Sequence, residues 1–302
     1  LADDLASTAV LATDTKILVA PSMNVRMWQT APTRRNVTQL EADGVAMVGP
    51  ENGDMACGEF GMGRMSEPEA ILAAIERLLG VGAGPLSGKH VIVTSGPTRE
   101  PLDPVRYISN ASSGKQGSAI GAALAALGAR VSFITGPAEA PAPAGCTLIP
   151  VETARQMHDA VRAALPADAA IFCAAVSDWR IADPASQKLK KRDGQNRLTL
   201  ELVRNSDILR DVSQPDEDRP SLVVGFAAET ENLIANARRK LAQKGCDWIL
   251  GNDVSPAKGT FGGDLNEVTL FEAAGEEAWG PLTKLEVGAR LAARVADFLR
   301  EG

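Results

Sequence analysis

From residue 90 onward, short apolar runs typical of buried strands alternate with alanine-rich or amphipathic runs typical of helices. We expect strands at 90–95, 130–136, 146–151, 169–177, 198–203, 221–229, 247–252 and 266–272. We expect helices at 116–129, 153–165, 230–245 and 282–300, the second of them capped by Thr153. Strands that alternate with helices indicate βαβ units, so the pattern predicts a parallel-rich sheet inside a three-layer α/β domain.

The first 80 residues follow a different pattern. We expect helices at 1–11, 33–41 and 66–80, short strands at 16–22 and 45–50, and a glycine-rich loop at 51–65. The stretch "GVGAGPLSGK" (80–89) is typical of a linker. A chain of 302 residues is long enough for two domains, and we place them at 1–82 and 83–302.

Charge and cysteine usage exclude several classes of protein. The net charge of −7 and the pI near 5.1 argue against a nucleic-acid-binding protein, which needs a basic surface. The four cysteines show no CxxC spacing, so we expect reduced thiols, no zinc site and a cytoplasmic protein. No apolar run reaches the roughly 18 residues of a membrane-spanning helix.

A long polar stretch, "SGPTREPLDPVRYISNASSGKQG" (95–117), separates the first strand of the alternating part from its helix. Strand-to-helix loops usually have about 2–6 residues, and longer ones are commonly functional. The stretch starts at the carboxyl end of a strand, where parallel sheets bind ligands. Its last residues enter a helix whose free N–H groups and dipole favour an anion. Gly114 and Gly117 would allow a phosphate to approach the backbone closely.

Other candidate ligand residues follow strands at the same predicted edge. Asp178 comes just after the run 169–177, and Phe226 near the end of 221–229 could stack on a base. Lys240 and Lys244 are four residues apart on a helix and so share one face. Two further stretches lie in the sequence between Asp178 and Phe226. They are the basic run "KLKKR" (188–192) and the helix start "NSDIL" (205–209), with Asn205 or Ser206 as cap. Several cations, an aspartate and an aromatic residue at one edge of an acidic protein favour a nucleotide triphosphate site.

The two histidines suggest no hydrolytic triad. His90 begins a strand and His158 lies within a helix, so we expect both to be structural. The chemistry should therefore depend on positioning and on charge stabilisation rather than on a histidine base.

Specific motifs give the chain a family resemblance. Over about 86–300 it resembles the phosphopantothenate–cysteine ligase family, through "VTSGPTREPLDPVRYISNASSGKQG", "AAVSDWR", "KLKK", "NSDIL", "VGFAAET", "KLAQKGCDWILGNDV" and "FGGDLNEVTL". Residues 1–80, with "VAPSMNVRMW" and "MACGEFGMGRM", are similar to the latter half of the flavin-dependent phosphopantothenoylcysteine decarboxylase. The pair resembles the bifunctional bacterial enzyme of coenzyme A synthesis, which implies a Rossmann-like ligase domain after a partial flavodoxin-like domain.

The ligase resemblance implies a reaction and a set of site residues. The carboxylate of 4′-phosphopantothenate would react with CTP in the presence of Mg²⁺, and L-cysteine would displace CMP from the acyl-cytidylate. Asn110 would act on the acyl-cytidylate, and no residue is assigned to the metal. The family resemblance assigns CTP to Phe172, Cys173, Ala174, Asp178, Lys188, Ser206, Asp207, Ile208, Leu209, Phe226, Lys240 and Lys244. Weaker candidates for phosphate or substrate binding are Arg106, Ser112, Ser113 and Gly114.

Two features depart from the family pattern. Members usually have Asn-Pro-Asp where this chain has Asn205, Ser206 and Asp207. In the decarboxylase part, Asn24 would bind the substrate carboxylate and Cys57 would protonate the product. The family's amino-terminal half, with most of its FMN cradle, has no counterpart here, so we expect decarboxylation only when that half is supplied.

The resemblance also implies a ligase homodimer.

Two other classes of protein remain as alternatives. A dinucleotide-dependent oxidoreductase is disfavoured because G-x-G-x-x-G is missing. A non-catalytic regulatory module that kept the fold is disfavoured because Asn110, Asp178 and the lysines are present. Release of pyrophosphate from CTP would separate the ligase from both.

Overall fold

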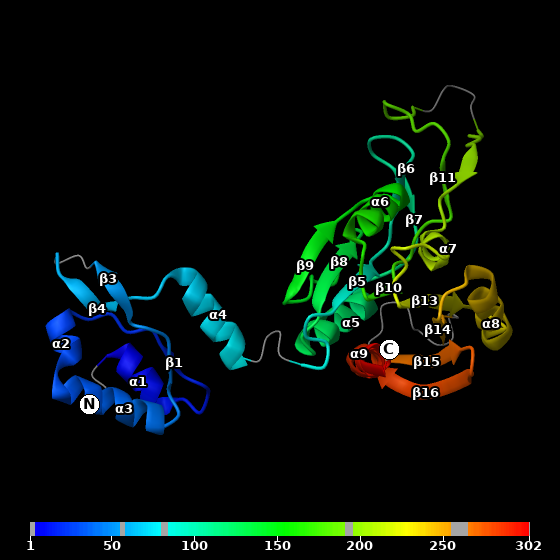
Figure 1. Cartoon of the computed structure of the whole chain (residues 1–302). Helices are drawn as coiled ribbons and strands as arrows, with labels where there is room; N and C mark the ends of the chain where they lie inside the picture. Colours follow the sequence, from blue (N-terminus) through cyan, green and yellow to red (C-terminus); the bar gives the residue numbers. More distant parts are fainter. Residues whose placement is uncertain (1–3, 55–57, 80–83, 191–195, 255–264, 302) are drawn as a thin grey trace. The chain divides into compact units, whose positions relative to one another are not determined.

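The computed structural model of the chain describes residues 4–54, 58–79, 84–190, 196–254 and 265–301 (Figure 1). Contacts within the chain divide it into two compact units, Leu1–Val81 and Gly82–Gly302.

The second unit is built on a sheet to which the described residues contribute eight strands. These strands are β5 (His90–Ser95), β8 (Arg130–Thr135), β9 (Cys146–Pro150), β10 (Ala169–Phe172), β13 (Leu222–Glu229), β14 (Trp248–Asp253), β15 (Leu265–Glu272) and β16 (Gly275–Thr283). Their order is β16-β15-β14-β13-β10-β5-β8-β9. Neighbours from β14 to β9 are parallel, whereas β15 and β16 pair antiparallel. The predicted parallel-rich sheet is therefore confirmed.

Helices cover both faces of this sheet. Val91 and Val93 of β5 belong to a core shared with α5 (Lys115–Ala126) and α9 (Lys284–Glu301). Ile92, between them, belongs to a second core with residues of α6 (Ala154–Ala164), α7 (Ile208–Ser213) and α8 (Leu233–Lys244). Successive strand residues point to opposite faces, so an uninterrupted apolar strand is buried between two helical layers. The three-layer architecture follows from this alternation.

The strand order reverses its direction of growth between β5 and β10. After β5 the chain adds β8 and β9 on one side, and then crosses over to add β10, β13 and β14 on the other. Consequently, the segment after β5 leads to α5 on one face, while the segment after β10 leads to α7 on the other. Open parallel sheets bind ligands outside the carboxyl ends of the strands at such a switch point.

An arm extends beyond the carboxyl edge of the sheet (Figure 1). It consists of two antiparallel pairs, β6 (Arg99–Pro101) with β7 (Tyr107–Ser109), and β11 (Trp179–Ile181) with β12 (Leu202–Arg204). The first pair lies inside the polar stretch that reads as a loop in the sequence. The strand expected at 198–203 begins only at Leu202, because its partner β11 is short.

The first unit consists of short elements. Its helices are α1 (Leu5–Ala12), α2 (Val25–Gln29), α3 (Ala31–Ala42) and α4 (Pro68–Leu79), and its strands are β1 (Leu18–Val19), β2 (Ala46–Met47), β3 (Glu51–Asp54) and β4 (Phe60–Arg64). The loop predicted at 51–65 is wrong in part, since β3 and β4 pair antiparallel. Gly61 lets β4 pack closely against α2, because a Cβ at this position would lie 3.1 Å from the side chain of Val25.

Helix starts agree with the sequence in one case and differ in another. Thr153 caps α6 in a full capping box with Gln156, as its position before the apolar run predicts. The cap of α7 is Asp207, whose carboxylate accepts from the N–H of Arg210 at 3.1 Å, rather than Asn205 or Ser206. Asn205 instead donates its side-chain N–H to the carbonyl of Ser177 at 2.8 Å.

Candidate functional site

Two adjoining hollows lie at the switch point of the sheet. The first, the α8 hollow, has a volume of about 280 Å³ and is walled by the ends of β10 and β13, by α7 and by α8. It contains ten of the twelve residues predicted to bind the nucleotide: Phe172, Ala174, Asp178, Ser206, Asp207, Ile208, Leu209, Phe226, Lys240 and Lys244. Gly225 of β13 leaves room for Leu209 of this wall, because a Cβ there would lie 2.6 Å from Leu209 Cδ2.

The second, the α5 hollow, has a volume of about 550 Å³. Its wall includes the start of α5, the segment after β10 and the beginning of α9. Among the predicted residues it brings together Asn110, Ser112, Ser113, Gly114 and Cys173.

The start of α5 can approach the sheet because of its glycines. A Cβ at Gly117 would lie 2.2 Å from Ser95 Oγ at the end of β5. Gly114, the residue before the helix, has φ of 75° and provides no side-chain cap. The first N–H groups of α5 therefore face the hollow without a capping side chain, which suits an anionic group.

Five residues line both hollows, namely Ala174, Val176, Asp178, Phe226 and Lys240. The two spaces are therefore neighbours, so a ligand in one can react with a ligand in the other. Asn110 lies on the α5 side of this shared wall and donates both hydrogen bonds of its amide nitrogen, to the carbonyls of Ala175 at 3.2 Å and Val176 at 3.1 Å.

Backbone contacts join the segments that follow β5 and β10. Thr94 accepts from the N–H of Cys173 at its carbonyl and from that of Ala174 at its hydroxyl, at 3.2 and 3.3 Å. Further out, Ala175 donates to Gly96 and accepts from Thr98. These contacts fix the two segments against each other, and thus position Asn110 and Asp178 across the same gap.

Cations of α8 approach the α8 hollow from one side. Lys240 donates to the carbonyl of Phe226 at 2.6 Å. Burial lowers the pKa of Lys240 below the usual lysine value, and the positive charge of Lys244 lowers it further. Lys244 forms an ion pair with Asp207, the cap of α7. Binding of an anion would relieve the repulsion between the two ammonium groups.

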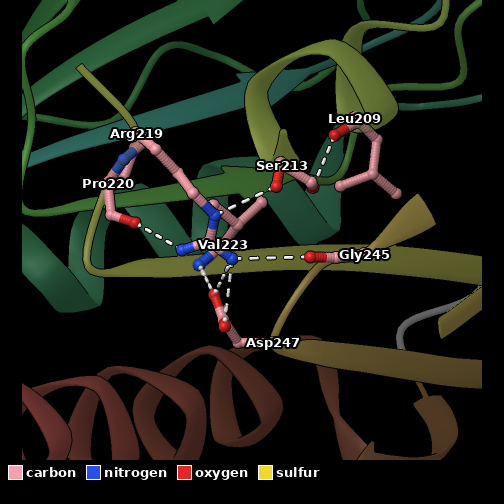
Figure 2. Close-up of polar contacts among 7 residues, drawn as sticks. All are labelled: Leu209, Ser213, Arg219, Pro220, Val223, Gly245 and Asp247. Carbon is pink, nitrogen blue, oxygen red and sulfur yellow. Dashed lines mark hydrogen bonds and ion pairs between the residues drawn. The ribbon is translucent and has the colours of Figure 1, made fainter. Parts of the chain in front are cut away.

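The guanidinium of Arg219 ties α7 to the end of α8 (Figure 2). It donates to the carbonyl of Ser213 in the last turn of α7 at 3.0 Å, and to that of Gly245, the cap of α8, at 3.4 Å. It also contacts both carboxylate oxygens of Asp247, one of which accepts from the N–H of Val223 at 2.7 Å. The two helices that wall the α8 hollow are thereby fixed to the sheet and to each other.

Two predicted residues lie in a different place. Arg106 and Lys188 line a basic hollow of about 1180 Å³ on the arm, together with Lys190 and Arg197, and not the α8 or α5 hollow. Arg106 is held by Asp103, whose carboxylate also accepts from the N–H of Leu189 at 3.1 Å. The Arg106 guanidinium holds the pKa of the buried Asp103 carboxyl far below its ordinary range.

The decarboxylase candidates lie in the first unit. Asn24 caps α2 and donates to Glu59 at 2.5 Å, on the wall of a hollow of about 930 Å³. Arg64, the cation in this wall, is paired with Glu67. Cys57 lies outside the described residues.

The remaining titratable candidates have structural roles. His90 is buried and contacts the carbonyl of Pro166 and the hydroxyl of Ser132. His158 approaches Asp211 at 3.3 Å. Burial raises the pKa of Cys173 to about 12, so this thiol stays protonated at neutral pH and is a poor nucleophile.

Several residues of the α5 hollow were missed in the sequence. Asn252 follows the core of β14 at the carboxyl edge, and the rule that points to Asp178 would also have found it. Asn266 comes from the antiparallel strand β15, and Lys284 from the start of α9, which follows the antiparallel strand β16. The parallel-strand rule does not apply there, so their sequence has no comparable signal.

Neither a metal cluster nor a membrane span is found within the part of the chain that the structure describes. It contains no group of three or more His, Cys, Asp or Glu side chains that could hold a metal ion. None of its helices combines the length and the apolar character needed to cross a membrane.

The fold and the two hollows define a three-layer α/β protein with a candidate ligand site at the switch point of the sheet. Family models agree with this class: the DNA/pantothenate metabolism flavoprotein C-terminal domain matches residues 86–299, and a flavoprotein domain matches residues 1–80. A crystal structure of the C-terminal domain of a coenzyme A biosynthesis bifunctional protein CoaBC is similar with a TM-score of 0.60 and 33% identity, over 73% of this chain and 100% of that one. A flavoprotein of this type from Streptococcus pneumoniae, 21% identical, shares the fold with a TM-score of 0.57, over 70% of this chain and 99% of that one.

Whole-length relatives identify the family. The coenzyme A biosynthesis bifunctional protein CoaBC of Vibrio vulnificus CMCP6 is 44% identical over 92% of this chain and 69% of its own length. That of Bacillus subtilis 168 is 40% identical over 100% of this chain and 74% of its own length. The chain therefore belongs to the CoaBC family of coenzyme A biosynthesis bifunctional proteins, which confirms the resemblance found in its motifs.

Proposed function

We propose that the second unit, with residues 83–302 as its domain, ligates 4′-phosphopantothenate to L-cysteine at the expense of CTP, and thereby serves coenzyme A biosynthesis. The observation that carries the proposal is the shared wall between the α8 hollow and the α5 hollow. A two-substrate activation needs a nucleotide and an acid side by side, and the adjoining hollows provide two such places.

In this proposal CTP occupies the α8 hollow. Phe226 offers an aromatic face for the base, and Asp178 offers a carboxylate to its amine or to the ribose hydroxyls. Lys240 and Lys244 neutralise the phosphates, helped by the fixed position of α8. Mg²⁺ would arrive with the phosphate oxygens and neutralise their charge.

The acid occupies the α5 hollow, with its phosphate near the start of α5. A carboxylate oxygen of the acid attacks the α-phosphorus of CTP, the bond to the β-phosphate breaks, and pyrophosphate leaves. The amine of cysteine then attacks the acyl carbon, the bond from this carbon to the CMP oxygen breaks, and the nitrogen loses a proton. Asn110 lies beside the shared wall and would hold the acyl group.

Asn110 constrains how this step can work. Both N–H groups of its amide already donate to the carbonyls of Ala175 and Val176. Asn110 can therefore donate to an oxyanion only by giving up one of these two hydrogen bonds. The energy of the bond that is lost and that of the bond that is gained are each about that of one hydrogen bond.

A two-stage product assay tests the reaction. The chain is mixed with CTP, Mg²⁺ and 4′-phosphopantothenate, and pyrophosphate is measured before and after L-cysteine is added. We expect one pyrophosphate per site before cysteine and steady release of CMP and amide after it. No pyrophosphate at either stage would contradict the ligase and favour the non-catalytic module.

We also propose that two copies of the chain associate through their second units. Lys188 and Arg106 are expected near phosphates, yet they line the basic hollow of the arm. An arm that reaches the hollows of a second copy would bring these cations to the ligands. Light scattering should show twice the 31.6 kDa mass of the chain, and a monomer that turns over would contradict the proposal.

For the first unit, residues 1–82, we propose a place in the flavin-dependent decarboxylation of the ligase product. The residues of its hollow do not by themselves fit a flavin nucleotide. The wall residues Met23, Met65 and Ile71 are apolar enough for a ring system, but its cation Arg64 is engaged by Glu67. These residues alone therefore do not support flavin chemistry.

A further inference from the structure

A series of hydrogen-bonded side-chain amides lines the α5 hollow and joins four elements. Gln116 in the first turn of α5 donates its side-chain N–H to the backbone carbonyl of Lys284 at 3.1 Å. Asn266 of β15 donates to Oε1 of Gln116 at 3.2 Å. Asn252 of β14 donates to Oδ1 of Asn266, also at 3.2 Å. All four residues line the α5 hollow, and we call this set the amide relay.

The amide relay has a fixed direction. A backbone carbonyl can only accept, so Gln116 must turn its NH₂ group toward Lys284 and its oxygen toward Asn266. Asn266 then has to donate to Gln116 and accept from Asn252. Because Asn266 is only 5% exposed, water cannot easily replace a mismatched contact, and a wrong orientation would leave two buried oxygens facing each other.

The open end of the relay is the side-chain oxygen of Asn252. Its nitrogen is committed to Asn266, so the carbonyl oxygen is the atom that the relay leaves for a ligand. The other functional groups on this wall are mainly donors: the N–H groups at the start of α5, and the ammonium groups of Lys115, Lys240 and Lys284. An acceptor held among donors can recognise only a ligand N–H or O–H.

We propose that Asn252 is a specificity-determining residue whose oxygen accepts a hydrogen bond from a substrate N–H or O–H, and that Gln116 and Asn266 are positioning residues that keep this oxygen presented. The inference rests on the proposed ligase function. The donor is either a hydroxyl or amide N–H of the acid, or the amine of cysteine. A substrate analogue that lacks this donor should bind more weakly, because the Asn252 oxygen would lose its hydrogen-bond partner.

Substitution of Asn252 tests the role of its oxygen. In the full chain, Asn252→Ala should raise the KM for one of the two substrates by about 3- to 10-fold, the effect of one lost hydrogen bond, with the KM for CTP unchanged. A rise for 4′-phosphopantothenate identifies the acid as donor, and a rise for cysteine identifies the amine. Unchanged KM values for both substrates would overturn the proposal.

A pair of charged substitutions tests the direction of the relay. Gln116→Glu leaves only acceptors at this position, so Asn266 still donates to it and the Asn252 oxygen remains presented. Gln116→Lys leaves only donors, so Asn266 turns round and Asn252 presents its NH₂ group instead. We expect the KM of the substrate that Asn252→Ala identifies as the donor to be at least about 3-fold higher in Gln116→Lys than in Gln116→Glu.

This order is opposite to the one that charge alone would produce. A lysine near the phosphate of the acid or the carboxylate of cysteine should lower the KM of that substrate and a glutamate should raise it, so the reverse order identifies the relay as the cause. Gln39→Glu and Gln39→Lys, on an exposed position of α3, are the matched controls and should leave both KM values unchanged. Equal KM values in the two Gln116 variants, or the order that charge predicts, would overturn the directional relay.

The wild-type chain distinguishes failure of the ligase function from failure of the amide relay. If it releases no pyrophosphate, the proposed ligase fails. If it is active while Asn252→Ala and the Gln116 pair behave as charge or simple structure predicts, only the relay fails. Thermal unfolding of each variant shows whether a changed KM comes from a folded protein.

Discussion

At the scale of single residues, the site depends on side chains whose polar atoms are already engaged. The amide nitrogen of Asn110 is held by two carbonyls, Lys240 donates to Phe226, and Lys244 is paired with Asp207. These contacts hold the groups in place at the site, and a ligand that binds the same atoms must exchange one of them. Each contact also predicts how a substitution acts.

Asn110→Ala should leave CTP binding largely intact and block amide formation. The side chain lines the α5 hollow and not the α8 hollow, so its loss should lower the rate of amide formation by about 100-fold or more. Quenched-flow measurement of the amide, with calorimetry for CTP, gives both quantities. Loss of CTP binding in this variant would instead assign Asn110 to the nucleotide.

Lys240→Met should weaken CTP binding by about 10-fold or more, because a charge-assisted contact to phosphate is lost. Burial lowers the pKa of Lys240, so rising pH should remove the ammonium proton, and with it CTP affinity, at a lower pH than for an ordinary lysine. This fall should be reduced in Lys240→Met. Arg239→Met, on the exposed side of the same helix, is the control, and equal affinities in the two variants would exclude Lys240 from the site.

At the scale of elements, polar contacts add to the apolar packing that fixes α7 and α8, and they also hold the arm. Arg219 and Asp247 fix α7 and α8 behind the α8 hollow. Asp103 does the same for the arm, by joining the turn after β6 to Leu189. These elements are short, so individual buried polar groups should have measurable effects on their stability.

Arg219→Met should lower the free energy of unfolding by about 1–3 kcal/mol, because three backbone carbonyls and Asp247 lose a partly buried partner. It should also raise the Kd for CTP, since α7 and α8 lose their common anchor. Arg300→Met, which removes an exposed pair with Asp297, should cost less than about 0.5 kcal/mol. Similar losses in urea denaturation for both variants would contradict this role of Arg219.

Asp103 predicts how stability depends on pH. Its pKa is lower in the folded protein than in the unfolded chain, so its stabilisation is complete above the unfolded value near 4 and is lost as the pH falls below it. Urea denaturation at pH 6 and at pH 3.5 should therefore show a smaller difference for Asp103→Asn than for the wild type. An identical pH dependence would show that Asp103 is not held in this way.

At the scale of the whole molecule, the parallel part of the second unit could be predicted closely. β5 begins and ends where the apolar run predicts, and Thr153 caps α6 as expected, because both signals are local. Asp178, Phe226 and Lys240 meet in one place because each lies near the carboxyl edge of the sheet. Such positions follow from sequence order and strand direction alone.

The features of the site that could not be predicted from the sequence depend on contacts between distant segments. Lys188 was expected at the phosphates, but the pairing of β11 with β12 places it on the arm. Asn266 and Lys284 reach the α5 hollow because β15 returns antiparallel beside β14, which no local pattern specifies. Asp207 caps α7 instead of Asn205, because the side-chain N–H of Asn205 donates to the carbonyl of Ser177.

The central claim is that the acid is activated as an acyl-cytidylate across the shared wall of the two hollows. It is tested most directly with 4′-phosphopantothenate labelled with ¹⁸O in both carboxylate oxygens, by mass spectrometry of the nucleotide released with cysteine. We predict CMP that carries one ¹⁸O atom in its phosphate, because a carboxylate oxygen becomes the bridge and stays with CMP when the C–O bond breaks. Unlabelled CMP, or CDP with labelled inorganic phosphate, would contradict the account.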